Sequence, residues 1–365
     1  MAEKKERILS IDVMRGINMF VLVFLASFVH AIAKACPSDL MAAIDMQFTH
    51  YKGFGFYAYD LVFPTFLFMA GCSWPFSLSS QQAKSASNLQ IVVKIFKRLV
   101  LLTFVGMVIS GLPTFDFMKI RFNSILGQIG MGWAIMAVIT LFLPRKWWIA
   151  AIGLLLAYGL SFWIYSALCT PAGIGPWKMG RNIISAVDKW MFAGYPGKYE
   201  GYFHNFGCAC SAFVGFGAGL VLKAKEASAK RKVLLLAGWG TVLGVLGGIS
   251  WGVGLCPLSK AQWNPSYILV TGGIDLLALA ALYLLVDVWK VTFWTPVFVV
   301  IGANALFAYA IRYFIDFGFA ARKLLCGIAS ALPACWTPVL DRTGAFAILW
   351  LLLFYMYRNR IYVRL

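Results

Sequence analysis

A histidine and an aspartate lie ten residues apart in the segment HYKGFGFYAYDLVFPTFLFMAG, in which His50 comes first and Asp60 opens a long apolar run. An ionisable pair at the mouth of an apolar helix is costly to desolvate, so it indicates chemistry. An imidazole can exchange a proton or attack as a nucleophile near neutral pH. The carboxylate of Asp60 could hold His50 in one tautomer, or it could cap the helix that follows.

A second charged pair lies in the first apolar segment, RILSIDVMRGINMF. Asp12 and Arg15 are three residues apart, so they share one face of a helix and can form an ion pair. That pair could simply anchor the helix at the edge of a membrane. Alternatively, the guanidinium of Arg15 could bind a phosphorylated ligand, because its planar fork of donors suits phosphate oxygens.

The elements that must position these residues are membrane helices. Of the 365 residues, 61% are hydrophobic and only 13% are charged, a composition typical of a polytopic membrane protein. We therefore predict an all-α integral membrane protein that forms one domain, 1–365, with about ten transmembrane helices of about 20 residues each. These helices are expected near residues 11–33, 57–79, 93–112, 124–143, 147–168, 203–222, 233–255, 266–287, 295–313 and 343–357.

The basic residues predict which loops face the cytoplasm. Lys and Arg are dense in the short loops, as they are in the cytoplasmic loops of membrane proteins. This pattern places both termini in the cytoplasm and the three histidines, His30, His50 and His204, at the outer face. The longer outer loops, 169–202 and 314–342, are rich in turn residues and could fold as lids over a site.

The net charge of +18 is explained by these loops, which would contact anionic lipid headgroups. We therefore predict membrane lipid as a partner and no binding of nucleic acid. The eight cysteines could form one or two disulfides at the outer face. Cys208 and Cys210 lack the spacing of a zinc site, so we expect them to pack in the core, and we predict no metal site.

Five blocks of sequence carry a resemblance to a known family. In order, they are RILSIDVMRGINM, H-x9-DLVFPTFLFMAG, the pair Glu200-Gly201, PLSKAQWNPSYILVTGG and VFVVIGANALFAYAI. Together they resemble the transmembrane N-acetyltransferases related to heparan-α-glucosaminide N-acetyltransferase, over residues 7 to about 315. The resemblance implies an acyltransferase that takes acetyl-CoA from the cytosol. The implied acceptor is an amino sugar of the glucosamine type, or a glycan, on the other side of the membrane.

The resemblance also assigns roles to individual residues. It implies His50 as the active-site histidine, and we predict that Asp60 completes the catalytic pair. We further predict that Asp12, Arg15 and Arg121 bind acetyl-CoA and that the acceptor is bound by Glu200, Lys260, Trp263, Ser266, Tyr267 and Asn304. The bacterial members of the family imply an inner (cytoplasmic) membrane, and the protein could form a homodimer.

This chain departs from the family pattern at several positions. Ala26 replaces an asparagine that the family often has about eleven residues after the first-helix arginine. The LQRIG-like motif of the family reads LGQIG here, with Gly127 and Gln128, so the arginine of that motif is missing. Lys198 and Tyr199, rather than Asp and Pro, precede Glu200. These changes concern the donor and acceptor sites more than the fold.

Two mechanisms and two other functions stay open from sequence. His50 could carry the acetyl group as an acyl-imidazole, or it could be the general base for the attacking amine. The fifteen residues from Arg15 to His30 span about 22 Å of helix, so only an extended donor could link the two faces. The other functions are a membrane O-acyltransferase of glycans and a transporter of amino sugars or glycan fragments. Pro64 interrupts the second helix as in transporters, but we find no matching internal repeat.

Overall fold

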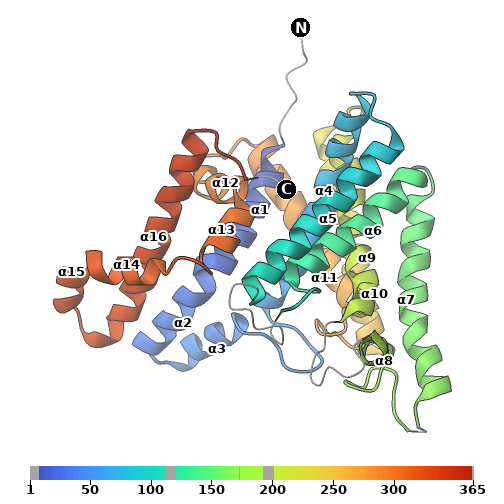
Figure 1. The fold of residues 1–365 in the computed structure, drawn as a ribbon, viewed down its shortest axis with the longest axis horizontal. Coiled ribbons are helices and arrows are strands. Elements are labelled where there is room, and N and C mark those ends of the chain that lie inside the picture. Colours follow the sequence, from blue (N-terminus) through green and yellow to red (C-terminus); the bar gives the residue numbers. More distant parts are fainter. Residues whose placement is uncertain (1–7, 112–119, 172, 192–200, 364–365) are drawn as a thin grey trace. The chain divides into compact units, whose positions relative to one another are not determined.

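The computed structural model describes residues 8–111, 120–171, 173–191 and 201–363, and the regular elements in these ranges are all helices (Figure 1). This confirms the predicted all-α class. The first elements are α1 (Leu9–Phe20), η1 (Val21–Leu25), α2 (Ala26–Ala35), α3 (Asp39–Gln47), η2 (Ala58–Leu61), α4 (Val62–Gln82), α5 (Asn88–Ser110), α6 (Ile125–Phe142) and α7 (Trp147–Cys169). Then come α8 (Ile183–Met191), η4 (Tyr202–His204), α9 (Asn205–Lys223), α10 (Ala229–Gly252) and α11 (Pro265–Leu282). The last elements are η5 (Tyr283–Val288), α12 (Thr295–Ala303), α13 (Ala305–Ile311), α14 (Phe317–Leu324), α15 (Cys326–Ser330), η6 (Ala334–Trp336) and α16 (Thr337–Arg358).

Eight helices in the described part of the chain are long and apolar enough to cross a membrane. They are Leu9–Ala35, Ala58–Gln82, Ile125–Phe142, Trp147–Cys169, Tyr202–Lys223, Ala229–Gly252, Pro265–Val288 and Ala334–Arg358. Two other expected spans differ for physical reasons. Helix α5 is long but carries Lys94, Lys97 and Arg98 in its first half, and the segment 295–311 breaks at Asn304 into two short helices. The count of ten and the cytoplasmic termini stay predictions.

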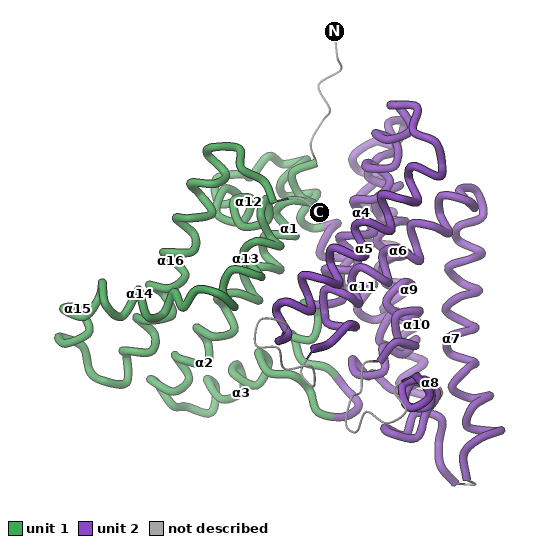
Figure 2. The backbone as a smooth tube through the Cα atoms, viewed as in Figure 1, with its two compact units in different colours: residues 1–52, 56–62, 281–364 green, residues 53–55, 63–280, 365 purple. Residues whose placement is uncertain are grey.

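The chain divides into two compact units, shown in Figure 2. Unit 1 comprises residues 1–52, 56–62 and 281–364, and unit 2 comprises residues 53–55, 63–280 and 365. Each unit has its own apolar core, so we describe each by itself. That residues 1–365 form a single domain stays a prediction.

Glycine allows two helices of unit 1 to touch at their backbones. A Cβ at Gly16 on α1 would lie 1.9 Å from the carbonyl oxygen of Phe298 on α12, and one at Gly302 would lie 2.6 Å from the carbonyl oxygen of Asp12. Such contacts between small residues stabilise pairs of membrane helices. The glycine of the RG motif is therefore a packing residue.

The first turn of α1 is capped by a residue almost 280 positions away. The carboxylate of Asp287, in η5, accepts hydrogen bonds from the backbone N–H of Leu9 at 3.0 Å and of Ser10 at 2.9 Å. These N–H groups have no partner within the helix, and a negative charge is favourable at a helix N-terminus. Asp287 thus fixes the end of the helix that carries Asp12 and Arg15.

Glycines also allow the backbones of α4 and α9 to touch in unit 2. A Cβ at Gly71 would lie 2.0 Å from the carbonyl oxygen of Ala212, and one at Gly215 would lie 1.9 Å from that of Phe68. Around this contact, apolar side chains of α4, α5, α6 and α9 form one core cluster. Helix α4 begins directly after the turn that contains Asp60.

The expected outer loops contain helices of their own. Residues 314–342 form α14, α15, η6 and the start of α16, and the described part of 169–202 contains α8. None of the eight cysteines forms a disulfide in the structure, so the expected disulfides are not present. Cys208 and Cys210 are buried in α9, as predicted.

Candidate functional site

His50 and Asp60 form a hydrogen-bonded pair in unit 1. Nδ1 of His50 lies 2.8 Å from Oδ1 of Asp60. The aspartate is 1% exposed, whereas the histidine side chain is 59% exposed. The second carboxylate oxygen, Oδ2, accepts the backbone N–H groups of Tyr51 and Tyr57, each at 3.1 Å. Three neighbours therefore hold the carboxylate, which in turn orients the imidazole.

The local sequence explains how the pair forms. Asp60 lies in the first turn that leads into α4, where its side chain caps the backbone N–H of Tyr57. Gly53 and Gly55 adopt φ values of 121° and 152°, which residues with a side chain rarely take, and they let the chain turn between the two partners. The two interpretations of Asp60 are thus compatible, because one oxygen caps the helix while the other binds His50.

This arrangement equips His50 for two kinds of chemistry. A carboxylate acceptor at Nδ1 keeps the proton on that nitrogen, so the lone pair is on Nε2. The ring of Tyr59 packs beside the imidazole, with centroids 5.0 Å apart, and limits its rotation. An exposed and oriented imidazole can act as a general base or as a nucleophile. The catalytic role itself stays a prediction.

A second histidine and aspartate pair in unit 1 offers a comparison. Nδ1 of His30, on α2, lies 2.5 Å from Oδ1 of Asp45, on α3. Both side chains are about one-third exposed, at 38% and 33%. The pair closes the connection between α2 and α3, and its carboxylate is not buried as that of Asp60 is. We interpret it as structural.

The predicted donor-binding residues are divided between the units. In unit 1, Arg15 lies 3.6 Å from Asp12, which confirms the ion pair expected from their spacing. In unit 2, Arg121 lies just before α6, and its charge acts on the buried ring of His204. The structure therefore does not gather these three residues into a cluster within one unit. Their binding of acetyl-CoA stays a prediction.

Trp263 occupies the centre of a buried aromatic group in unit 2. Its Nε1 donates a hydrogen bond to Oγ of Ser211 at 3.0 Å, and its ring packs edge-on against Phe63 and Tyr267 at 4.6 and 5.3 Å. The residue is 1% exposed, and its φ of 49° is unusual for a side chain of this size. In this structure the indole belongs to the core, so its expected contact with a sugar stays a prediction.

Residues that follow Trp263 in the sequence are also buried in this core. Oγ of Ser266 donates to the carbonyl of Cys256 at 2.7 Å, and Tyr267 is fully buried. Burial raises the pKa of the Cys256 thiol, which keeps it protonated and unreactive. Lys260 is partly exposed, in the turn before Trp263. Four of the predicted acceptor residues thus lie on one segment of unit 2, residues 260–267.

The remaining two predicted acceptor residues lie elsewhere. Asn304, in unit 1, separates α12 from α13 and uses its amide to hold the C-terminal segment. Nδ2 donates to the carbonyl of Ile361 at 3.0 Å, and Oδ1 accepts the N–H of Val363 at 2.9 Å. Glu200 lies outside the described residues. Both assignments stay predictions.

The second half of the Glu200-Gly201 motif has a clear structural reason. Gly201 has a φ of 68°, and a Cβ on it would lie 2.7 Å from Nδ1 of His204. Asp188, on α8, holds this turn by accepting the N–H groups of Gly201 at 2.8 Å and Tyr202 at 3.2 Å. Gly201 therefore shapes the turn beside the His204 ring, a role that sequence reasoning did not assign.

Sequence reasoning also missed a buried acid within a membrane helix. Asp275, on α11, is buried, and its Oδ1 accepts a hydrogen bond from Oγ1 of Thr65 on α4 at 2.6 Å. Its Oδ2 has no hydrogen-bond partner in the described structure. The signal was present in the sequence, because Asp275 is the one charged residue in the run ILVTGGIDLLALAALYLLV. Such a residue indicates function by default.

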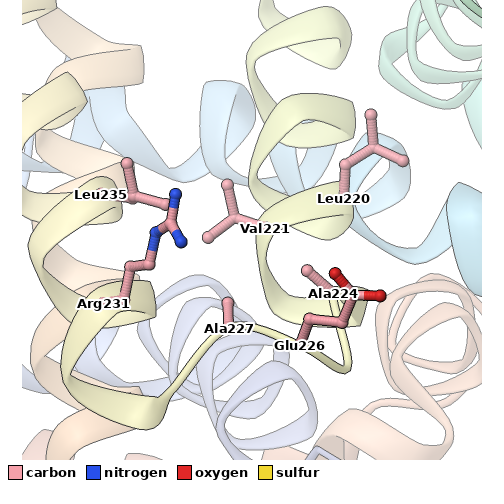
Figure 3. A pocket seen from close by; sticks show the side chains of 7 residues that line it. All are labelled: Leu220, Val221, Ala224, Glu226, Ala227, Arg231 and Leu235. Atoms are coloured by element: carbon pink, nitrogen blue, oxygen red, sulfur yellow. The ribbon is translucent and has the colours of Figure 1, made fainter.

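One surface groove lies where α9 ends and α10 begins (Figure 3). Its volume is about 380 Å³, and it is lined by Leu220, Val221, Ala224, Glu226, Ala227, Arg231 and Leu235. Its walls are mostly apolar, and the two charged side chains have opposite signs. Among the described residues, no group of three or more His, Cys, Asp or Glu side chains could hold a metal ion.

The long apolar helices define the class of multispan membrane proteins. Comparison with known proteins agrees with this class. The family described as "Domain of unknown function (DUF5009)" matches residues 7–113, which include the Asp12–Arg15 pair and the dyad.

Two curated relatives carry the resemblance further. Over 359 residues, the chain is 23% identical to heparan-alpha-glucosaminide N-acetyltransferase of Homo sapiens, covering 83% of this chain and 52% of the relative. The protein of the same name from Mus musculus is also 23% identical, with 83% and 53% covered. The chain thus spans about half the length of these relatives. These matches support the family resemblance drawn from the five sequence blocks.

Proposed function

We propose that this protein is a membrane acetyltransferase that transfers the acetyl group of acetyl-CoA to the amine of a glucosamine-type sugar. The donor would bind from the cytosol, and the acceptor would bind at the opposite face of the membrane. The observation that carries this proposal is the dyad of His50 and Asp60, at the mouth of an apolar helix, in a chain related to named N-acetyltransferases.

The dyad supports either of two balanced reaction sequences. In the first, Nε2 of His50 attacks the thioester carbonyl, the C–S bond breaks, and the thiolate of CoA leaves. The amine then attacks the acyl-imidazole, which forms the amide, returns the imidazole and releases one proton. In the second, the amine attacks the thioester carbonyl directly while Nε2 takes its proton, the C–S bond breaks, and the thiolate of CoA leaves. In both, Asp60 stabilises the positive charge that develops on the ring.

Reconstituted vesicles test the proposal. The protein in proteoliposomes receives acetyl-CoA with a labelled acetyl group on one side and glucosamine on the other, and labelled N-acetylglucosamine is measured over time. We expect transfer by the wild type and a fall of about 10²-fold or more in the variant His50→Ala. The matched control is His30→Ala, because His30 also pairs with an aspartate in unit 1. This control is expected to stay within about twofold of the wild type.

The same vesicles distinguish the other functions. An O-acyltransferase would give an ester, which hydroxylamine cleaves, whereas the expected amide resists it. A transporter would move labelled glucosamine across the membrane without acetylating it. Transfer that is unchanged in His50→Ala would overturn the role of the dyad.

A further inference from the structure

In unit 2, five buried polar atoms have no hydrogen-bond partner in the described structure, and they belong to two short segments, 204–205 and 259–264, that meet where His204 stacks on Trp263. They are Nδ1 and Nε2 of His204, Oδ1 of Asn205, Oγ of Ser259 and Nδ2 of Asn264. We call these four residues the Trp263 cluster. Each is at most 6% exposed. Leaving a buried donor or acceptor unpaired is unfavourable, so five such atoms in two segments that meet indicate a site that a ligand completes.

One ring contact joins the two segments of the cluster. The His204 ring lies nearly parallel to that of Trp263, with centroids 6.0 Å apart and an interplanar angle of 17°. Asn264 accepts the backbone N–H of Ser259 through Oδ1 at 3.0 Å. Asn205 donates through Nδ2 to Asn123 at 3.0 Å, which leaves its oxygen unpaired.

The backbone at this place is strained as well. Trp263 keeps a φ of 49°, a region that a bulky residue enters only when its surroundings impose it. Strain of this kind concentrates at ligand sites. This observation is independent of the unpaired atoms, and it falls at the centre of the same cluster.

The donors and acceptors of the cluster match sugar hydroxyls. A neutral imidazole offers one N–H and one lone pair, Asn205 offers an acceptor, Asn264 a donor, and the Ser259 hydroxyl both. A hydroxyl group also donates and accepts, so it can satisfy each of these atoms. The four residues of the cluster include no carboxylate that could pair with an ammonium group.

We propose that the Trp263 cluster binds the hydroxyl groups of a hexose, with His204 as the central hydrogen-bond partner, and that it does not bind the amine of an amino sugar. The choice of a sugar rests on the proposed function, but the binding can be measured without acetyl-CoA.

The test measures binding to the full-length protein in detergent. Glucosamine, glucose, which lacks the amine, and cyclohexylamine, which lacks the hydroxyls, are titrated by calorimetry. We expect the two sugars to bind with dissociation constants within about threefold of each other and cyclohexylamine not to bind. In His204→Phe, which keeps a planar ring but removes both nitrogens, sugar binding is expected to weaken by about tenfold or more.

Two further measurements separate this role from a structural one. Without sugar, the melting temperature of His204→Phe is expected to equal or exceed that of the wild type, because two unpaired buried atoms are removed. The matched control, His30→Phe, is expected to bind sugar normally. If His204→Phe does not fold, Ser259→Ala removes a single oxygen and is expected to weaken sugar binding by about threefold or more.

Several results would overturn the inference. These are no binding of either sugar by the wild type, equal sugar binding by His204→Phe, or cryo-electron microscopy at saturating glucose that shows only ordered water at the cluster. If the wild type transfers acetyl groups but His204→Phe binds sugar unchanged, this inference alone fails. If the cluster binds sugar as expected but the wild type transfers no acetyl group, the proposed function alone fails.

Discussion

Replacing Asp60 by asparagine tests the dyad most directly, because it changes the charge and almost nothing else. The carboxylate accepts three hydrogen bonds, from Tyr51, Tyr57 and Nδ1 of His50. In Asp60→Asn, the amide oxygen can still accept the two backbone N–H groups. The amide nitrogen then faces His50 and donates to Nδ1, so the ring proton must move to Nε2. That nitrogen loses the lone pair that both mechanisms require.

The structure sets the size of the expected effect. In a catalytic triad, the same loss of the correct tautomer lowers the rate by about 10⁴-fold. Because His50 is 59% exposed and water can partly replace the partner, we expect a fall of about 10²–10⁴-fold in the rate of acetyl transfer, or roughly 3–5 kcal/mol. Two of the three hydrogen bonds survive, so the free energy of unfolding is expected to fall by only about 1–2 kcal/mol.

The assay is acetyl transfer in proteoliposomes at matched amounts of folded protein, with thermal unfolding measured in parallel. Asp45→Asn is the control, since Asp45 pairs with His30 but is one-third exposed. It is expected to keep full activity. The proposed role of the Asp60 carboxylate is refuted if Asp60→Asn transfers acetyl groups at a rate within about twofold of the wild type.

Three further predictions concern packing, helix capping and pH. Gly16→Ala places a Cβ 1.9 Å from a backbone oxygen of α12, so it is expected to lower the free energy of unfolding, measured by thermal unfolding, by about 1–3 kcal/mol. The control Gly153→Ala has nothing within 4 Å of its new Cβ, so it should raise the free energy of unfolding or leave it unchanged. Asp287→Ala removes the cap of α1 and should cost about 1 kcal/mol, visible as faster amide hydrogen exchange in the first turn; unchanged exchange would contradict the capping role. At the start of α14, a hydrogen bond from a backbone N–H lowers the pKa of Asp316 below 3.8, so its stabilisation is complete above that pH and is lost as the pH falls through the folded pKa. The protection factors of amides in the first turn of α14, which correct for the intrinsic pH dependence of exchange, should therefore fall in acid, and Asp316→Ala should abolish this fall.

The sequence predicted well wherever the determinants are local. Long apolar runs identified the membrane helices, because the thickness of the hydrocarbon core sets their length. The spacing of three residues between Asp12 and Arg15 was enough to predict their ion pair, since helix geometry fixes which positions share a face. His50 and Asp60 are also close in the chain, and one capped turn brings them together.

Only the tertiary structure decided what lies beside what over long separations. Thr65 meets Asp275 across 210 positions, and the ring of His204 lies against Trp263, 59 positions away. No periodicity in the sequence encodes these contacts, because they depend on which helix faces pack and on glycines that let backbones approach to contact distance. The sequence by itself therefore determined the membrane class, the local pairs and the candidate catalytic histidine. The tertiary structure alone decided which distant polar groups were buried together, because burial is a property of packed surfaces and not of the order of residues.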